Sequence, residues 1–351
     1  MAKILVAGGC GYIGSHTIVD LIENGFDVIS VDNNSRSNPR IFDGVEKITG
    51  KKVKNYKVDL CNFDDTFAIF QENEDIEGII HFAAYKAVNE SVEKPLMYFE
   101  NNLNSLINLL KCVQEFNIPY FVFSSSCTVY GNPDEMIVTE KTPPKPAESP
   151  YGYTKQMGEQ IINEFAKSAG TQCILLRYFN PVGAHPSIMI GEMPIGRPQN
   201  LVPAITQTAI GKLNKMTVYG SDYDTRDGSC IRDFIHVCDI AHAHTLAIQY
   251  LQNKKNNALC EVFNLGTGNG VSVLEAIHSF EKISGVQLNY EIGPRRPGDV
   301  IAIYANNDQA KTKLGWDPKY SLDEMMRTAW EWEQRLKADD TIFTGKPVEL
   351  N

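Results

Sequence analysis

The chain has 351 residues, of which 43% are hydrophobic and 22% are charged, and its formal net charge is -10. This size and apolar content predict one large domain, or two closely joined domains, with an ample core. The acidic balance argues against a nucleic-acid-binding surface, so a negatively charged ligand would need its own local arginines. The eight cysteines form no CxxC pair and no zinc spacing, so we expect neither a disulfide framework nor a metal site.

The N-terminus runs directly into a strand-like segment and lacks the charged region, apolar region and cleavage site of a signal peptide. No apolar run is long enough to span a bilayer. Together with the scattered cysteines, these features predict a reducing, cytoplasmic location.

The chain begins with an alternation of strand, helix and strand. The expected elements are a strand at 3–7, a helix at 15–24 and a strand at 26–31. Gly8, Gly11 and Gly14 lie in the first turn, where glycine permits a tight bend, the close approach of a pyrophosphate, and a helix N-terminus directed at negative charge. Asp32, 18 residues after Gly14, would accept hydrogen bonds from ribose hydroxyls and repel a 2′-phosphate. This pattern predicts NAD binding, and the alternative is a structural turn in another α/β protein.

The alternation then continues through the first half of the chain. Strands are expected at 53–58, 78–82, 120–123 and 173–178, with helices at 64–73 and 95–116. Repeated β–α units favour a doubly wound parallel sheet, whose ligands lie at the carboxyl ends of the strands. Asn101, Asn102 and Asn104 fall inside the second helix, where asparagine is unfavourable, so at least one should make a specific hydrogen bond. We expect His81 to pack behind its strand rather than act in catalysis.

A helix start at Ser149-Pro150 precedes Tyr151 and Lys155. Four residues of spacing place the two side chains on one helix face. A neighbouring ammonium favours the phenolate and should lower the tyrosine pKa from its usual ~10. The alternative is an ordinary amphipathic helix with a solvated lysine. Because Ser126 ends the preceding strand, the fold could bring it to the same place as this pair.

The second half of the chain predicts a smaller mixed α/β lobe. The expected elements are helices at 201–211, 239–251, 272–284 and 322–336, and strands at 216–219, 232–237 and 262–265. Gly266, Gly268 and Gly270 resemble a second nucleotide motif, but no acidic strand end follows, so we expect a structural turn. The predicted division is a Rossmann-type domain at 1–180, rejoined by about 232–262, and a substrate lobe at 181–231 and 263–351.

Several longer motifs extend over nearly the whole chain. They are GGCGYIGSH (8–16), VDN (31–33), HFAAYKAV (81–88), SSSCTVYG (124–131), SPYGYTK (149–155), RYFNPVGAHP (177–186) and RDFIHV (232–237). Together they resemble the extended short-chain dehydrogenase/reductase family, in particular its UDP-glucose (UDP-galactose) 4-epimerases. The resemblance implies reversible inversion at sugar C4 through a 4-keto intermediate, with the hydride held on tightly bound NAD. It also implies a homodimer.

The resemblance further implies which residues form the site. The implied NAD-binding residues are Gly8, Gly11, Tyr12, Ile13, Gly14, Asp32, Asn33, Asp59, Leu60, Phe82, Ala83, Lys86, Asn101, Ser124, Tyr151, Lys155 and Tyr178. The implied UDP-sugar-binding residues are Ser126, Tyr151, Asn180, Asn200, Leu201, Tyr219, Arg232, Arg296, Asp299 and Ile303. Tyr151 would be the catalytic base, Lys155 would tune it and hold the nicotinamide ribose, and Ser126 would bridge tyrosine and sugar.

Alternatives remain within and outside this family. Ile303 stands where relatives restricted to UDP-glucose and UDP-galactose have tyrosine and relatives that accept N-acetylated sugars have a small residue, so a UDP-N-acetylhexosamine or UDP-hexuronate 4-epimerase stays open. A 4,6-dehydratase would need an Asp-Glu pair after Ser126, where this chain has Cys127 and Thr128. An inactive NAD-binding sensor or scaffold would be expected to lose Tyr151 or Lys155, and both are present.

Overall fold

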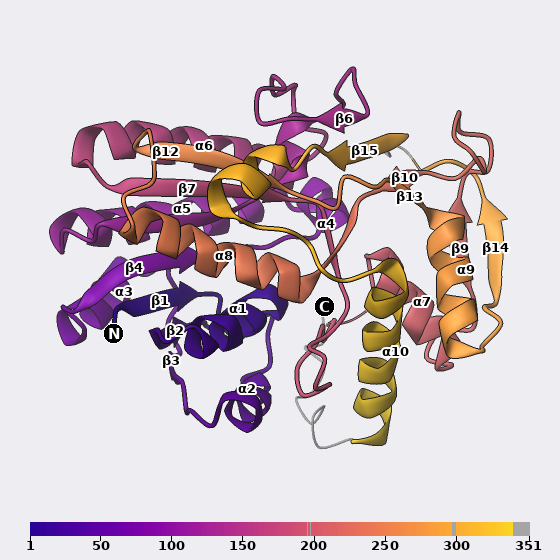
Figure 1. The fold of residues 1–351 in the computed structure, drawn as a ribbon, viewed down its shortest axis with the longest axis horizontal. Coiled ribbons are helices and arrows are strands. Elements are labelled where there is room, and N and C mark those ends of the chain that lie inside the picture. Colours follow the sequence, from indigo (N-terminus) through magenta and orange to yellow (C-terminus); the bar gives the residue numbers. More distant parts are fainter. Residues whose placement is uncertain (195, 197, 297–299, 340–351) are drawn as a thin grey trace.

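The computed structural model describes residues 1–194, 196, 198–296 and 300–339. Within these residues the largest layer is a seven-stranded sheet of order β12-β7-β5-β4-β1-β2-β3, in which neighbouring strands are parallel (Figure 1). Its strands are β1 (Lys3–Ala7), β2 (Asp27–Val31), β3 (Lys54–Tyr56), β4 (Ile76–His81), β5 (Tyr120–Ser126), β7 (Gln172–Tyr178) and β12 (Cys260–Leu265). The doubly wound parallel sheet predicted from the sequence is therefore confirmed.

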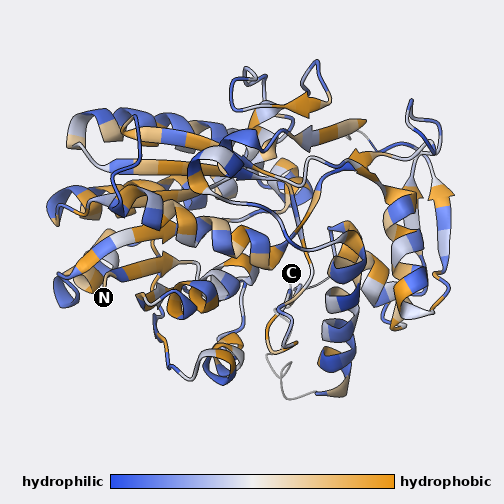
Figure 2. Ribbon diagram, in the orientation of Figure 1, coloured by the Kyte–Doolittle hydropathy of each residue, from blue (hydrophilic) through white to orange (hydrophobic). Residues whose placement is uncertain are grey.

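Helices cover both faces of this sheet. One face carries α1 (Tyr12–Glu23), α2 (Ile41–Thr49) and α8 (Val237–Gln252), and the other carries α3 (Phe63–Glu72), α5 (Pro95–Glu115) and α6 (Pro150–Ala169). A short helix, α4 (Val88–Glu93), packs against α5 and α6. Because strand side chains alternate between faces, Val122 joins the first core while Phe121 and Phe123 join the second. Figure 2 shows this apolar layer along the central strands.

The second lobe lies beside the sheet, around its own core, on the right in Figure 1. Its helices are α7 (Leu201–Ala209), α9 (Val273–Ser284) and α10 (Leu322–Ala338). Its strands form the order β13-β10-β15-β6 and the pairs β11-β8 and β14-β9. These strands are β6 (Ile137–Val138), β8 (Asn180–Val182), β9 (Met216–Tyr219), β10 (Ile231–Arg232), β11 (Phe234–His236), β13 (Val271–Ser272), β14 (Tyr290–Gly293) and β15 (Ala302–Ala305), and single turns occur at η1 (Cys127–Tyr130) and η2 (Ala310–Leu314).

The carboxyl ends of the central strands meet at one edge of the sheet. Ala7 pairs with Val31 and with His81, and Ser126 pairs with Tyr178. The strand order reverses around β1, which is the position where open α/β sheets bind ligands. The fold therefore gathers the residues that follow these strands along one crevice.

The local signals for α6 and α1 differ in how well they mark the helix start. α6 begins at Pro150, as predicted, and the Ser149 side chain accepts from Gly152 N at 3.2 Å. α1 begins at Tyr12 rather than Ser15, because Gly11 takes an extended backbone and serves as the N-cap.

His81 is 2% exposed and contacts the rings of Phe121 and Phe123, in the packing role expected for it.

The strand predicted at 232–237 is interrupted at Asp233, which separates β10 from β11. The buried Asp233 carboxylate accepts from Thr267 N at 2.8 Å, Thr267 Oγ1 at 2.7 Å, Gly268 N at 3.3 Å and Ala305 N at 3.1 Å. The glycine-rich turn after β12 is thus organised around an internal carboxylate, in agreement with the structural turn expected there. Asp233 also joins three segments that are distant in the sequence.

We predict that Asp233→Ala lowers the free energy of unfolding by about 3 kcal/mol or more, because it leaves several backbone N–H groups without an acceptor. Urea unfolding followed by circular dichroism measures this. Asp224→Ala, an exposed acid in the same lobe, is the control and should change the value by less than about 0.5 kcal/mol. Equal effects of the two substitutions would contradict the role of Asp233.

Candidate active site

The first turn is shaped by glycines that leave no room for side chains. Gly8 has φ +86°, and a Cβ there would lie 2.8 Å from Ala83 N. A Cβ on Gly14 would lie 2.2 Å from Gly8 O. Gly11 caps α1 without supplying a side-chain acceptor, so the N–H groups of Tyr12 and Ile13 can face a ligand. A backbone cradle at a helix N-terminus suits the phosphates of a dinucleotide.

Asp32 follows β2 directly and lies beside this turn. Its carboxylate accepts from Cys10 N at 3.1 Å, Asn34 N at 2.9 Å and Ser37 Oγ at 2.9 Å. Burial raises the pKa of Asp32, and these hydrogen bonds oppose the rise. The neighbouring Asn33 accepts from Ser35 N at 2.9 Å through its Oδ1. The structure therefore places Asp32 next to the glycine cradle, as the sequence predicted.

Two of the implied NAD-binding residues, Asp59 and Leu60, follow β3. Asp59 accepts from Cys61 N at 2.9 Å, and Leu60 is buried. The Cys61 thiol lies 3.5 Å from the backbone oxygen of Asn101, so α5 is brought against this segment. Asn102 makes the specific bonds expected of a helical asparagine: it pairs with the backbone of Tyr85 at both its amide atoms, donating at 3.0 Å and accepting at 2.8 Å.

The segment after β4 approaches the glycine turn closely. Phe82 N and Ala83 N both donate to Ala7 O, at 2.8 and 3.0 Å. Lys86 instead forms a half-exposed ion pair with Glu192, with Nζ and Oε1 3.3 Å apart. This pair connects the edge of the sheet to the loop after β8. Lys86 remains more than half exposed in this pair.

The predicted catalytic residues lie together where α6 crosses the end of β5. Lys155 is 4% exposed and donates from Nζ to Ser124 O at 2.6 Å. The Ser126 hydroxyl lies near Tyr151 and acts to lower the pKa of its phenol. On the neighbouring strand, the Tyr178 hydroxyl hydrogen-bonds Ser124 Oγ. The fold therefore unites a half-buried phenol with a buried ammonium and a buried serine hydroxyl at one strand end.

The expected effect of Lys155 on Tyr151 is corrected by this geometry. Burial raises the pKa of Tyr151 to about 12, and the nearby Ser126 hydroxyl only partly opposes this rise. Burial likewise lowers the pKa of Lys155 to about 8. Lys155 Nζ is 5.8 Å from the Tyr151 ring centroid and is directed at a carbonyl. Desolvation, which sequence spacing does not reveal, thus outweighs the lysine charge in the protein alone.

A buried ion pair behind this site was not anticipated from the sequence. Glu159, one helical turn after Lys155, accepts from Arg177 Nε at 2.8 Å and from Arg177 Nη2 at 2.5 Å. Both residues are less than 10% exposed. An arginine within the apolar strand CILLRY was the available signal, because a charge in such a strand demands a partner.

The predicted substrate residues form two groups in the second lobe. The Arg296 guanidinium lies over the Tyr219 ring, 5.4 Å from its centroid. Arg232 donates from Nη1 to Val300 O at 2.6 Å, and Asn180 donates from Nδ2 to Asp233 O at 3.2 Å. Asn200 is the N-cap residue of α7, with an exposed side chain that makes no capping hydrogen bond, and Leu201 begins that helix. Asp299 lies outside the described residues.

The two lobes meet near Ser126. Burial raises the pKa of the Cys127 thiol to about 11, and the positive charge of Arg232 opposes this rise, so the guanidinium lies within electrostatic reach of the residue after Ser126. Ile303 pairs with Arg232 in the β10–β15 register and packs in a cluster with Tyr130 and Phe179. The catalytic strand end and the substrate lobe are therefore contiguous.

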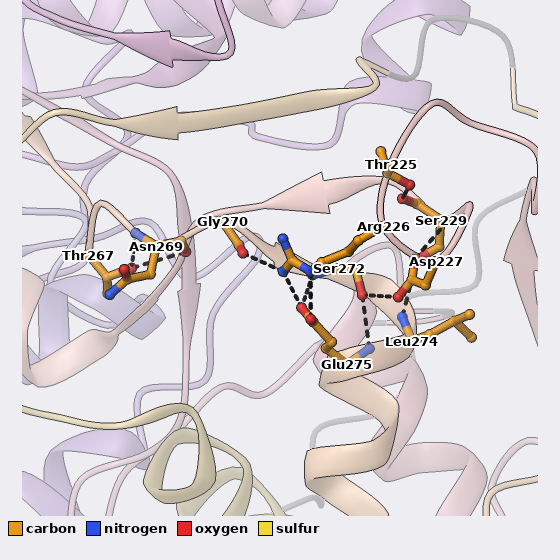
Figure 3. A network of polar contacts seen from close by, with 10 residues as sticks. All are labelled: Thr225, Arg226, Asp227, Ser229, Thr267, Asn269, Gly270, Ser272, Leu274 and Glu275. Carbon is orange, nitrogen blue, oxygen red and sulfur yellow. Dashed lines mark hydrogen bonds and ion pairs between the residues drawn. The ribbon is translucent and has the colours of Figure 1, made fainter.

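The loop between β9 and β10 is fastened to the start of α9 (Figure 3). Arg226 donates from Nε to Glu275 at 2.6 Å, and the Ser272 hydroxyl hydrogen-bonds Asp227. Asp227 also accepts from Ser229 N at 2.9 Å. Since this loop begins after Tyr219, the network fixes the path between the two groups of predicted substrate residues.

Among the described residues, no group of three or more His, Cys, Asp or Glu side chains could hold a metal ion. No helix in the same residues is long and apolar enough to cross a membrane.

Comparison with known proteins gives full-length similarity. The family model described as GDP-mannose 4,6 dehydratase matches residues 5–329. A UDP-glucose 4-epimerase of Bacillus subtilis is 45% identical over 331 residues, which are 94% of this chain and 96% of the relative.

Solved structures give the same picture. UDP-glucose 4-epimerase from Bifidobacterium longum, in complex with NAD+ and UDP, has a TM-score of 0.91 and 44% identity, covering 95% of this chain and 98% of that one. The UDP-Glc/GlcNAc 4-epimerase of Campylobacter jejuni has a TM-score of 0.82 and 34% identity, covering 95% and 100%. The chain therefore belongs to the extended short-chain dehydrogenase/reductase family, among its UDP-glucose 4-epimerases.

Proposed function

We propose that this protein is an isomerase that reversibly interconverts UDP-galactose and UDP-glucose by inverting sugar C4 with bound NAD. The observation that carries the proposal is that Tyr151, Lys155 and Ser126 lie together at the end of β5, on the same edge of the sheet as the glycine turn that follows β1. The 45% identical Bacillus subtilis epimerase supports it.

The residues present fit NAD. The cradle at Gly8 and Gly14 excludes a Cβ, the N-terminus of α1 carries no side-chain cap, and Asp32 stands beside both. When bound, NAD would supply the hydride acceptor and donor and a positive ring that favours the Tyr151 phenolate. The proposed NAD-binding residues are Gly8, Gly11, Tyr12, Ile13, Gly14, Asp32, Asn33, Asp59, Leu60, Phe82, Ala83, Lys86, Asn101, Ser124, Tyr151, Lys155 and Tyr178.

Residues of the chain itself would accept and return the proton of the sugar 4-hydroxyl. Tyr151, as phenolate, would take the proton of the sugar 4-hydroxyl, with Ser126 as a short path between them. Removal of that proton and of the C4 hydrogen gives a 4-keto sugar. After the sugar turns in the pocket, the hydride would return to the opposite face of C4 and Tyr151 would return the proton to O4, so the inversion involves no net oxidation. Lys155 would hold positive charge beside the developing phenolate and contact the nicotinamide ribose.

The second lobe would bind the UDP part of the substrate. Arg232 and Arg296 suit a diphosphate, because guanidinium groups match phosphate oxygens in charge and geometry. Tyr219, under Arg296, would meet the uracil. Asn180, Asn200, Leu201 and Asp299 complete the proposed set, and Ile303 would border the sugar.

The division into domains is proposed along the same lines. Residues 1–180 with 232–262 would form the NAD-binding domain, and 181–231 with 263–351 the UDP-sugar lobe. The position of α8 on the sheet supports the rejoining segment. β12 continues to Leu265, past the predicted boundary, and β6, β10 and β11, which fall wholly or partly in the first set of residues, pair with strands of the second lobe.

Two other functions are weighed against specific residues. A 4,6-dehydratase, the activity for which the matching family model is described, lacks its acid and base here, since Cys127 and Thr128 follow Ser126. An N-acetylhexosamine epimerase is favoured by one feature: Ile303 is smaller than tyrosine, and the Campylobacter jejuni relative is described for both UDP-Glc and GlcNAc. Incubation with UDP-galactose, UDP-N-acetylgalactosamine and UDP-galacturonate, each followed by NMR at C4, separates these substrates.

We further propose a cytoplasmic homodimer. All eight cysteines are free, which suits a reducing compartment. The helices α4, α5 and α6 pack together and expose large apolar side chains, which are Val88, Val92, Leu96, Ile107, Tyr153 and Met157. Leu96 is 79% exposed. An apolar helical face of this kind suits the same face of a second copy.

We predict that Tyr151→Phe retains bound NAD and UDP-sugar but loses turnover by about 1,000-fold or more, because the proton acceptor is removed. Turnover is measured on UDP-galactose, and bound NAD by absorbance after denaturation of the purified protein. Tyr153→Phe, an exposed tyrosine on the same helix, is the control. Near-wild-type turnover in Tyr151→Phe would remove this residue as the base.

Ile303→Tyr should reduce activity on UDP-N-acetylglucosamine far more than on UDP-glucose, because added bulk next to Phe179 would narrow the sugar pocket. The ratio of kcat/KM for the two substrates measures this. If both values fall together, the assignment of Ile303 to the sugar pocket is wrong.

Replacing Leu96 and Ile107 by glutamate should convert a dimer into a monomer, because charges cannot be buried at an apolar interface without partners. Light scattering coupled to size exclusion gives the mass. Leu259→Glu, at an exposed apolar residue outside this face, should remain dimeric. A monomeric wild type, or a doubly substituted dimer, would contradict the proposed interface.

A further inference from the structure

α6 contacts the last three residues of β5 from three successive helical turns. Tyr151 lies beside Ser126, whose hydroxyl acts to lower the pKa of the phenol, and Lys155 donates to Ser124 O at 2.6 Å. One turn further, Glu159 Oε1 accepts from Ser125 Oγ at 2.5 Å. Residues four apart on a helix share a face, so the catalytic pair and Glu159 form one row along the strand end.

Glu159 is held from the opposite side by β7. Ser125 and Arg177 point to the α6 face of the sheet because strand side chains alternate; their neighbours Phe123 and Leu175 lie in the core on that face. Arg177 donates two hydrogen bonds to the Glu159 carboxylate, at 2.8 and 2.5 Å. The carboxylate therefore joins the catalytic helix to two adjacent strands at once.

The network continues into the turn that follows Ser126. Arg177 Nη1 lies 3.0 Å from Tyr130 OH, and Tyr130 OH donates to Asn264 Oδ1 at 2.6 Å. Tyr130 is fully buried. A buried, charged network is tolerated only when each member is satisfied, so a displacement of α6 along the strands would leave charges unpaired.

We propose that Glu159 is a positioning residue for catalysis. Because Arg177 and Ser125 hold its carboxylate, Glu159 fixes the position of α6 along β5, and thereby the positions of Tyr151 and Lys155. This inference rests on the proposed epimerase function. It assigns to a residue outside the substrate and cofactor contacts the task of holding the base and its lysine partner in register with Ser124 and Ser126.

Glu159 also supports the positive charge of Lys155. The groups that face Lys155 are Tyr151 and Glu159 on α6, His81 on β4 and the Ser124 carbonyl on β5. Burial lowers the pKa of Lys155, and Glu159 raises it. His81 is neutral near pH 7, because burial and then Lys155 lower its pKa to about 3. Glu159 is thus the carboxylate that favours the lysine ammonium.

The test compares the full-length holoenzyme with Glu159→Gln. Glutamine keeps the size of the side chain but removes the charge that pairs with Arg177. We expect kcat on UDP-galactose to fall on the order of 100-fold, as displacements of about 1 Å do, with KM and bound NAD changed less than about threefold. The alkaline limb of the kcat profile and the NMR titration of Lys155, assigned with Lys155→Met, should both move to lower pH.

Two further variants separate positioning from stability. Glu261→Gln is the control. Glu261 lies on β12, is as buried as Glu159, and accepts from Tyr250 OH at 2.8 Å and Lys313 Nζ at 3.3 Å. The kcat of this variant should stay within about threefold of wild type. Replacing Glu159 and Arg177 together by methionine removes both charges. The melting temperature, lowered in Glu159→Gln by the unpaired Arg177, should return to the wild-type value, while kcat stays low.

Defined outcomes overturn the inference. A Glu159→Gln protein with kcat within about threefold of wild type, an equal loss of kcat in Glu261→Gln, or full activity in the double methionine variant each contradicts the positioning role. An unchanged Lys155 titration contradicts the electrostatic part. A wild-type protein that inverts no UDP-sugar contradicts the proposed function instead, and the Lys155 titration then still tests the contact between Glu159 and Lys155.

Discussion

The docking of α6 on the end of β5 is the constraint on which the candidate site depends. Lys155 reaches Ser124, and Glu159 reaches Ser125 and Arg177. These contacts hold Tyr151 beside Ser126 at the carboxyl edge of the sheet, where the glycine turn and Asp32 also lie. A parallel sheet brings its strand ends to one line, and the helix adds reactive side chains to that line at every turn.

Desolvation dominates the electrostatics of this site. It raises the pKa of Tyr151 to about 12 and lowers that of Lys155 to about 8, so each group is pushed toward its neutral form. The active pair needs the opposite, a phenolate beside an ammonium. Glu159 helps the ammonium, and the positive ring of NAD would help the phenolate. Lys155, with a pKa of about 8, is mostly charged near pH 7, so it is Tyr151 that would acquire its working charge only when NAD is bound.

The two lobes are connected by polar contacts at several points. Tyr12 OH donates to Gly183 O at 2.5 Å, so the first turn of α1 touches the loop after β8. Lys86 pairs with Glu192, and Asp233 gathers the turn after β12 and the end of β15. Tyr12 and Lys86 lie near the glycine turn, and their partners lie in the loop after β8. These contacts therefore fix the proposed nucleotide subsite relative to the proposed sugar subsite.

The sequence by itself determined the features that depend on local conformation and periodicity. Gly8 and Gly14, Asp32 and the Ser149-Pro150 helix start each express a backbone requirement that short patterns encode, and the Tyr151–Lys155 spacing follows from helix geometry alone. The tertiary structure decided the features that depend on partners distant in the chain. It split the strand at Asp233, paired Glu159 with Arg177, and placed Arg232 near Cys127. It also reversed the expected pKa shift of Tyr151, because burial is a property of the packed fold and cannot be read from residue spacing.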